Sequence, residues 1–590
     1  MSAYGRATTL GVIFIALLLP AKAHSGPQET EQLAHWLALR AETKLRRLTA
    51  KREVGTSLED FLEEERDENV ARELRLLYRR NGGRTLFMSR GELSPSGEEA
   101  ARLVVEVTRH GIRPDGYRCA EVRQLVEKTK TLRAALRRPP AIWTPPKGWT
   151  VPDSPPFEPE IEERLDDIAR TSQLYVTALQ RLDVRLAAGL LRFIQDTADD
   201  SPGRGVPSTL VLRLARSEPH PRSEVGSVPG APLMGLLPDH PQYALLVAAL
   251  ERYRFVWATS SLQKLPPEAP VLPGTRSGVV GLARERLALM GFLDEPGQAV
   301  FDDTMRRALE NYQRSRGRRV TGEMDEGTRR DLNRDPEWWL RRIMLALHRH
   351  RTSPTREVFG RTYIRTNIPE YLTELWVEGE RELRMPSLVG SPETPTPELS
   401  STLTEFRINP RWNVPPGVEQ REIEPRLLDD SGFKEEYRFR RAGRGARVRY
   451  YQEPGPWNFL GRAIFPIYNR DYIALHGSRR DHLFSSEKRA HSNGCVNLKD
   501  EVAFARAILE ADRHPARARL DGWLESWRTR TVRLRRPIPV YLEYQTVVVD
   551  DEGVINFLPD IYRLDRPLLT EIDEPRHVWP KIAPHRPKHR

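Results

Sequence analysis

The spacing of apolar residues changes along this 590-residue chain, and that change limits the folds it can adopt. Over residues 27–140, 160–196 and 240–256, apolar side chains recur every three to four positions, as on one face of an amphipathic helix. Beyond residue 360, shorter runs rich in β-branched and aromatic residues are typical of strands. Together with the length, this pattern predicts a multi-domain α+β protein whose first part, residues 27–271, is a helical scaffold region.

Local signals divide the helical part. Residues 58–80 (LEDFLEEERDENVARELRLLYRR) predict one helix that ends at Asn81-Gly82-Gly83. Residues 139–159 and 198–232 are rich in Pro, Gly or Ser and are predicted to be linkers or loops.

Residues 272–336 predict a compact module of three short helices around one small core. The second helix begins near Asp302 or Asp303, either of which can accept hydrogen bonds from the first free N–H groups. Gly317 ends it, and Val320-Thr321-Gly322 turns the chain toward the third helix.

The remainder of the chain is predicted as a connecting helix over residues 337–357 and a mostly-β domain over 358–573. The strand candidates are residues 363–368, 372–377, 448–452, 464–468, 472–475, 538–544 and 546–549, and residues 501–511 are helical. Within this domain the polar stretch 416–450 is predicted to be an insertion.

The first 23 residues have the pattern of a secretory signal peptide: Arg6, an apolar run Leu10–Leu19, Pro20, and Ala21-Lys22-Ala23 as the cleavage site. An apolar run of ten residues is too short to cross a bilayer of about 30 Å, which disfavours an uncleaved anchor, and no later segment is long enough. We therefore expect an exported protein.

For an exported chain of net charge +11, anionic cell-wall polymer or a membrane surface is a more natural partner than nucleic acid. Residues 574–590 form a basic tail.

The chain has only two cysteines, Cys119 and Cys495, which excludes a disulfide framework and metal centres built on several thiolates. Cys495 follows Ser492-Asn493-Gly494, a polar turn, and His476 stands at the end of a predicted strand. A neighbouring imidazole can activate a thiol and carry its proton. A glycine before the thiol lets the backbone turn so that N–H groups point at a developing oxyanion. The segment therefore predicts a Cys495–His476 pair.

Three other interpretations of Cys495 stay open at this stage: a buried structural residue, a zinc ligand together with His482 and His491, or a disulfide with Cys119. Cys119, in helical surroundings, is predicted to be structural. We expect neither a metal nor a cofactor.

The segment resembles the catalytic motif of the L,D-transpeptidases, which have a YkuD-type domain: His476, a gap, then Ser492-Asn493-Gly494-Cys495-Val496-Asn497. Further segments resemble the large YcbB-like subfamily, namely Asn367–Tyr371, Asn409–Pro415, Gly455–Gly461, Ile464–Pro466 and His482–Phe484. Residues 301–332 resemble the peptidoglycan-binding three-helix module, with Tyr312 in place of the usual Phe. An ordinary helical bundle without a ligand is the alternative for that module.

The resemblance implies an acyltransferase acting on peptidoglycan stem peptides in the periplasm. Cys495 would attack the carbonyl of the third stem residue, backbone N–H groups at Gly494 would hold the oxyanion, and His476 would protonate the departing D-Ala. Transfer to a second stem amine gives a 3→3 crosslink; water or a lipoprotein amine as acceptor, a non-catalytic scaffold, and a thiol protease or amidase are the alternatives. Asn493 stands where many members of the family have His, which favours His476 as the base, and His491, two residues earlier, is a weak alternative.

The resemblance also indicates residues near the substrate and a cap, residues about 416–450, over the cleft. The candidates for substrate binding are Ser492, Asn493, Asn497, Gly477, Trp412, Trp457 and Tyr472. Each tryptophan can equally belong to the core. Other cell-wall enzymes are the expected protein partners.

Overall fold

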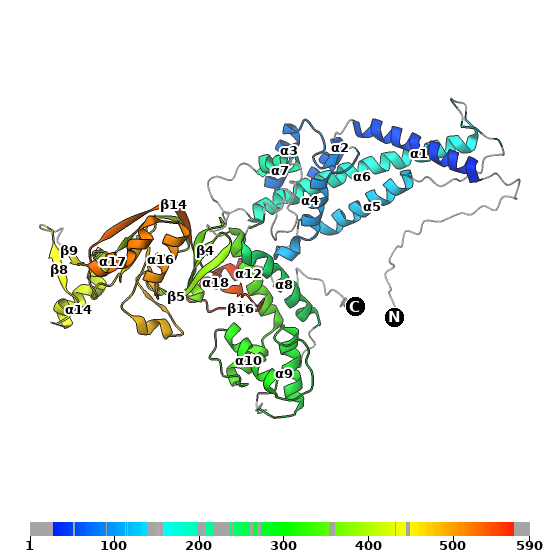
Figure 1. Cartoon of the computed structure of the whole chain (residues 1–590). Coiled ribbons are helices and arrows are strands. Elements are labelled where there is room, and N and C mark those ends of the chain that lie inside the picture. Colours follow the sequence, from blue (N-terminus) through cyan, green and yellow to red (C-terminus); the bar gives the residue numbers. More distant parts are fainter. Residues whose placement is uncertain are drawn as a thin grey trace. The chain divides into compact units, whose positions relative to one another are not determined.

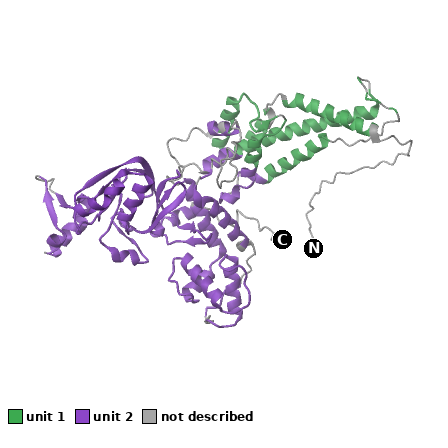
Figure 2. Cartoon of the chain, in the orientation of Figure 1, with its two compact units in different colours: residues 1–101, 120–188 green, residues 102–119, 189–590 purple. Residues whose placement is uncertain are grey.

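The computed structural model describes residues 27–571 except 51–53, 66, 90, 113, 115, 138–147, 149, 152, 154–156, 198–206, 217–236, 239, 260–262, 268–272, 353–359, 431 and 444–448. The predicted signal peptide and the basic tail therefore lie outside the described residues. The chain divides into two compact units (Figures 1 and 2). Unit 1 comprises residues 1–101 and 120–188, and unit 2 comprises residues 102–119 and 189–590.

The first part of the chain is helical, as predicted. Its helices are α1 (Pro27–Ala50), α2 (Gly55–Glu64), α3 (Glu68–Arg80), α4 (Pro95–Val105), α5 (Cys119–Arg137), α6 (Pro159–Thr197), α7 (Pro207–Arg216) and α8 (Pro241–Thr259). A short hairpin of β1 (Met88–Ser89) and β2 (Glu92–Leu93) interrupts them, and η1 (Val107–His110) follows α4. In unit 1, apolar side chains of α1 and α6 form a buried core that includes Trp36, Leu37, Tyr175 and Leu179.

Two helical predictions were wrong in detail. Residues 58–80 form two helices, because the Asp67 carboxylate accepts hydrogen bonds from the N–H groups of Asn69 and Val70 and so begins a new helix at Glu68. The stretch 198–232, predicted as loop, contains α7. Val211 and Leu214 are buried at helical spacing, and this burial outweighs the proline and glycine around them.

The three-helix module is present as α9 (Gly278–Leu289), α10 (Asp303–Ser315) and α11 (Glu326–Leu332). The side chains of Ser277, Asp302 and Asp325 cap the three N-termini. Gln313 is fully buried and joins α10 to the turn before α11. Its Oε1 accepts from the N–H groups of Thr321 and Gly322 at 2.8 and 2.9 Å, and its Nε2 donates to the Glu323 carbonyl at 2.8 Å. Gln313 and the Thr321-Gly322 pair are thus parts of one hydrogen-bond network within the module.

The module does not have a small core of its own, contrary to the prediction. Its apolar residues share one cluster with α8, with α12 (Pro336–Thr352) and with a C-terminal hairpin of β15 (Val547–Val549) and β16 (Ile555–Phe557). The Arg316 guanidinium lies inside this cluster, 4.1 Å from the Trp339 ring centroid and 4.5 Å from that of Phe557. The hairpin was predicted to belong to the β domain, yet it buries its side chains against the module.

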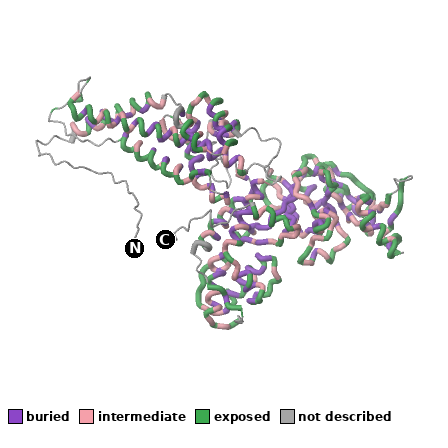
Figure 3. The backbone as a smooth tube through the Cα atoms, turned by 180° about the vertical axis from the view of Figure 1, so that it is seen from behind, coloured by how far each residue is buried: buried purple, intermediate pink, exposed green. Residues whose placement is uncertain are grey.

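A third core belongs to a sheet in the order β12-β5-β13-β11-β10-β6-β14-β3-β4, and a further pairing of β4 with β5 closes the sheet on itself. The strands are β3 (Tyr363–Asn367), β4 (Leu372–Val377), β5 (Glu380–Gly390), β6 (Leu399–Ile408), β10 (Ala463–Pro466), β11 (Ala474–His476), β12 (Ala490–Ser492), β13 (Val496–Leu498) and β14 (Arg530–Glu543). Helices α16 (Glu501–Ala511) and α17 (Leu520–Ser526) pack on it (Figure 1). Short helices η4 (Ile368–Glu370), η7 (Asp481–Ser485), η8 (Pro515–Arg519) and α18 (Asp565–Glu571) complete this part. Figure 3 shows the buried segments.

Residues 412–452, called the insertion below, have a small core of their own, made by Val414, Ile423, Phe433 and Phe439. Residues 416–450 were predicted as a polar insertion, and their described part consists largely of short helices and strands. The insertion contains β7 (Trp412–Asn413), α13 (Pro416–Val418), the π-helical turn η5 (Glu419–Ile423), α14 (Glu424–Asp429), α15 (Phe433–Glu436), β8 (Phe439–Ala442) and β9 (Arg449–Gln452). Its strands pair in the order β7-β9-β8.

The network around Gln313 predicts a large stability effect from one substitution. Gln313→Ala leaves the Thr321 and Gly322 N–H groups without their acceptor, and we expect a loss of about 3 kcal/mol in the free energy of unfolding. Denaturant unfolding and hydrogen exchange of residues 320–328 measure the effect. The control Asn311→Ala, on the exposed face of α10, should cost less than about 0.5 kcal/mol. Equal effects of the two variants would contradict this reading of the network.

Candidate active site

The pairing of β11 with β13 places the two predicted catalytic residues on one face of the sheet. The strands are parallel, with Leu475 opposite Val496 and His476 opposite Asn497. Leu475 and Val496 point into the sheet core, so the alternation of side chains turns His476 and Asn497 to the other face. Cys495 directly precedes β13 and shares the face of Asn497. Cys495 lies two positions before Asn497, the residue opposite His476. Since two positions along a strand span about 7 Å, Cys495 is displaced from His476 by about that distance along the strand direction.

Cys495 is a free thiol at the rim of the sheet and is half-buried. Its Sγ lies 4.0 Å from the carbonyl oxygen of Tyr472. Atoms packed around the sulfur raise the pKa of Cys495 above its usual value, and a hydrogen bond from the Ala474 backbone opposes that rise. The resting side chain is therefore a thiol at neutral pH.

His476 is buried, and its hydrogen bonds fix the orientation of its ring. Nδ1 lies 2.6 Å from the Gly477 carbonyl oxygen, and because a carbonyl only accepts, this contact assigns the proton to Nδ1. Nε2 is left with its lone pair, and the Asn497 amide nitrogen lies 3.1 Å from Nδ1 and 3.2 Å from Nε2. Burial lowers the pKa of His476 to about 4, so the imidazole is neutral near pH 7. No hydrogen bond joins it to Cys495 in the described structure.

Gly477, directly after His476, packs against the start of α16. A Cβ on Gly477 would lie 2.3 Å from the carboxyl carbon of Glu501, so only glycine fits at this position. The Glu501 carboxylate accepts from the Arg462 N–H at 2.7 Å, and burial raises the pKa of Glu501. Neighbouring α16 thus fixes the backbone that carries the imidazole.

Backbone and side-chain bonds also hold the loop before the nucleophile. The Ser492 hydroxyl accepts from the Gly494 N–H at 3.2 Å and donates to the Cys495 carbonyl. Thr396 donates to the Gly494 carbonyl at 2.8 Å. Gly494 itself has φ of +100°, a conformation that requires glycine. The Cys495 N–H, by contrast, has no acceptor within the described part of the chain.

A residue far along the chain fixes Thr396 in turn. The Tyr562 hydroxyl accepts from the Thr396 N–H at 3.1 Å and donates to the Gly390 carbonyl at 2.6 Å. The ring of Tyr562 stacks on Tyr544, with centroids 5.4 Å apart. Sequence reasoning missed Thr396 and Tyr562, because neither lies near a recognisable motif.

The remaining predicted site residues lie in different surroundings. Tyr472 is 89% exposed beside the thiol, whereas Trp412, the first residue of the insertion, packs against Phe439 of the insertion and against Phe459. The Arg438 guanidinium covers Trp457. Asn493 donates through Nδ2 to Glu422 of the insertion. His491 is exposed, and its Nε2 lies 2.9 Å from the Lys488 carbonyl oxygen.

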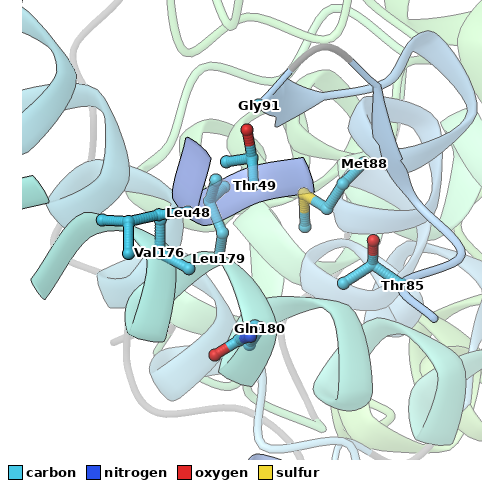
Figure 4. A pocket seen from close by; sticks show the side chains of 8 residues that line it. All are labelled: Leu48, Thr49, Thr85, Met88, Gly91, Val176, Leu179 and Gln180. Carbon is cyan, nitrogen blue, oxygen red and sulfur yellow. The ribbon is translucent and has the colours of Figure 1, made fainter. Parts of the chain in front are cut away.

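Other features of the described residues lie apart from this site. His482, His491 and Cys495 do not form a metal-binding group, and we find no cluster of three or more potential ligands in the described part of the chain. Cys119 and Cys495 form no disulfide with each other, so the disulfide interpretation was wrong. A small pocket in unit 1 is lined by apolar side chains, such as Leu48 and Val176, and by the polar side chains of Thr49, Thr85 and Gln180 (Figure 4). Among the residues described, no helix is long and apolar enough to cross a membrane.

Comparison with known proteins identifies two domains. The model of the L,D-transpeptidase catalytic domain (YkuD) matches residues 361–514. The model described as "Putative peptidoglycan binding domain" matches residues 276–332. The chain thus carries an L,D-transpeptidase catalytic domain, whose matched range contains Cys495 and His476, and a domain of the peptidoglycan-binding type.

A curated relative agrees with the first match. The chain is 28% identical over 225 residues to "Putative L,D-transpeptidase" of Haemophilus influenzae, which is 35% of this chain and 45% of the relative. The chain therefore matches less than half the length of this relative.

Two solved structures are also similar. An L,D-transpeptidase of Enterococcus faecium is 12% identical, with 31% of this chain and 50% of that chain covered and a TM-score of 0.17. One from Xylanimonas cellulosilytica is 12% identical, with 47% and 99% covered and a TM-score of 0.14.

The raised pKa of Cys495 and the low pKa of His476 predict how thiol reactivity depends on pH. Between pH 6 and 8 the imidazole stays neutral and the thiolate fraction is small, so we expect the rate of alkylation by iodoacetamide to rise about tenfold per pH unit. Mass spectrometry of the Cys495 peptide, in a Cys119→Ser background, measures this rate. A rate that is constant from pH 6 to 8 would instead indicate a thiolate–imidazolium pair.

Proposed function

We propose that this protein is a cysteine-dependent L,D-transpeptidase of peptidoglycan. The observation that carries the proposal is the β11–β13 pairing, which puts His476 and Cys495 on one face within the matched catalytic domain. The domain matched at residues 276–332 is consistent with a cell-wall substrate. We further propose that the protein is exported and acts in the periplasm, where it meets stem peptides and other cell-wall enzymes.

In the first half of the reaction, the thiol of Cys495 attacks the carbonyl carbon of the third stem residue. The proton of the thiol passes to Nε2 of His476, which is unprotonated in the resting structure. Nε2 must exchange its contact with Asn497 for one with sulfur, and catalytic hydrogen bonds often form only once substrate is bound. The bond between carbonyl carbon and nitrogen then breaks, D-Ala leaves with the proton, and a thioester remains on Cys495.

The second half reverses the proton path. The side-chain amine of another stem attacks the thioester, His476 takes its proton, and the thiolate of Cys495 leaves and is reprotonated. The product is a 3→3 crosslink. Water in place of the amine would give an L,D-carboxypeptidase, which uses the same residues.

The oxyanion of both tetrahedral intermediates needs donors that are free when it forms. The Cys495 N–H meets this requirement, since no described residue accepts from it. The Gly494 N–H donates to the Ser492 hydroxyl in the resting state and can join it once that bond is released. Ser492 therefore shapes the loop, and Gly494 permits its turn.

The other candidate residues take supporting roles in this proposal. Asn497 and Gly477 orient the imidazole through the contacts of its two ring nitrogens. Exposed Tyr472 offers an aromatic surface beside the thiol for the donor stem. Trp412 and Trp457 act through the insertion, which we propose as the cap.

Loss of the nucleophile gives the first test. Cys495→Ala should form no covalent adduct with a tetrapeptide stem or a carbapenem, while wild type and the control Cys119→Ser should each gain one acyl group. Intact-protein mass spectrometry measures the adduct. If wild type forms no adduct with either compound, the protein is not a transpeptidase of this kind.

The acceptor is tested separately on whole sacculi. Digested sacculi from cells that express wild type should contain 3→3 dimers, and those from cells with Cys495→Ala should lack them. Mass spectrometry of the muropeptides measures both. Stems shortened by D-Ala without such dimers would show that water, not a stem amine, is the acceptor.

A further inference from the structure

A carboxylate of the insertion contacts the catalytic motif. Oε1 of Glu422 accepts a hydrogen bond from the side-chain amide of Asn493, two residues before Cys495. Oε2 of the same residue lies 3.9 Å from Nη2 of Arg480. The Glu422 and Arg480 side chains are 28% and 41% exposed, so solvent and solutes can reach the contact.

Each partner in this contact is held by its own surroundings. Glu422 belongs to the π-helical turn η5, between α13 and α14, and the next residue, Ile423, is fully buried in the core of the insertion. Single π-helical turns are rare and occur frequently at functional sites. Arg480 is fixed from the other side, because Nη1 donates to the His491 carbonyl at 3.4 Å and its backbone N–H donates to the Ser478 hydroxyl at 3.1 Å.

An amide N–H together with a guanidinium is a donor set that suits a carboxylate. The neighbouring Arg479, which lies 5.7 Å from the ring centroid of Tyr437, adds positive charge to the same loop. Glu422 therefore occupies, from within the chain, a position that also fits a carboxylate of a ligand.

We propose that Asn493 and Arg480 bind the terminal carboxylate of the donor stem, and that Glu422 occupies this site in the resting protein. This inference rests on the proposed function. In a stem that ends in D-Ala, three bonds separate the carboxylate carbon from the carbonyl carbon that Cys495 attacks, a span of about 4 Å. A site formed partly by Asn493, two residues from the nucleophile, matches that short span.

In this proposal one site binds two carboxylates in turn, that of Glu422 in the resting protein and that of the donor stem during the reaction. A donor with a free carboxylate displaces Glu422 and gains the charged interaction with Arg480. A stem end without that charge gains less and leaves Glu422, and with it the insertion, in contact with the motif. The site thus selects donors by the charge of their last residue.

The test compares two synthetic donors, a tetrapeptide ending in D-Ala and its counterpart ending in D-alaninamide. For each variant, the ratio of kcat/KM for the acid to kcat/KM for the amide isolates recognition of the carboxylate, because the differing leaving amines affect all variants alike. Release of D-Ala or D-alaninamide is followed by mass spectrometry. Arg480→Gln should lower this ratio about tenfold through KM for the acid, as expected for loss of a partly exposed charge-assisted contact.

Removal of the competing carboxylate should act in the opposite direction. Glu422→Gln should lower KM for the acid about threefold and leave kcat for both donors unchanged. The matched controls are Arg479→Gln and Glu424→Gln, which change the same charges at exposed neighbouring positions and should keep the wild-type ratio. All the substituted side chains are at least partly exposed, so the variants should fold, and circular dichroism verifies this.

The outcomes separate this inference from the proposed function. If wild type forms an acyl-enzyme but Arg480→Gln keeps the wild-type ratio, the carboxylate site is wrong and the transpeptidase proposal stands. If Arg479→Gln lowers the ratio as much as Arg480→Gln, the effect is general electrostatics and the site is again wrong. If wild type forms no acyl-enzyme with either donor, the proposed function fails first.

Discussion

The parallel pairing of β11 with β13 is the constraint on which the candidate site depends. The thiol and the imidazole come from positions 19 residues apart, and this register brings Cys495 and His476 to one face. A shift of β11 by one residue against β13 would turn His476 into the sheet core, expose Leu475 and separate His476 from the face of Cys495 and Asn497. The buried apolar residues of the two strands therefore stabilise the site as well as the fold, because any other register loses their burial.

The register fixes the strands but not the loop between them, and that loop is held by other segments. Thr396, 98 residues from Gly494, bonds to the carbonyl of that glycine, and Tyr562 holds Thr396 by its backbone N–H. Tyr562 lies outside the range that matches the catalytic-domain model. The C-terminal part of the chain thus takes part in placing the nucleophile, and the matched range by itself lacks one of the supports of the Cys495 loop.

Local signals in the sequence predicted much of this structure, and contacts between distant segments account for what was missed. Capping residues and Gly317 located α10, residues 501–511 were recognised as the helix α16, and the Cys495 segment could be recognised from its residues alone. Strands β5 and β6 were missed because charged and hydroxyl side chains on their exposed faces hide the apolar alternation. No local pattern indicates that Glu422 meets Asn493, 71 residues away, or that the β15–β16 hairpin packs against α10 and α12.

The β15–β16 hairpin restrains the movement of the matched peptidoglycan-binding domain, because the two share one buried core. Three residues separate β14, a strand of the catalytic sheet, from β15, and the side chains of β15 are buried in the same cluster as those of α10. Arg342 of α12 donates to the Leu558 carbonyl at 2.7 Å, and Arg349 of α12 bonds to Asp565 at 2.5 Å. A module that shares its core in this way cannot reorient freely on a flexible linker, since reorientation would expose buried apolar surface. The module, α12 and the β15–β16 hairpin therefore form one packed body, and a ligand bound to the module would be bound to that whole body.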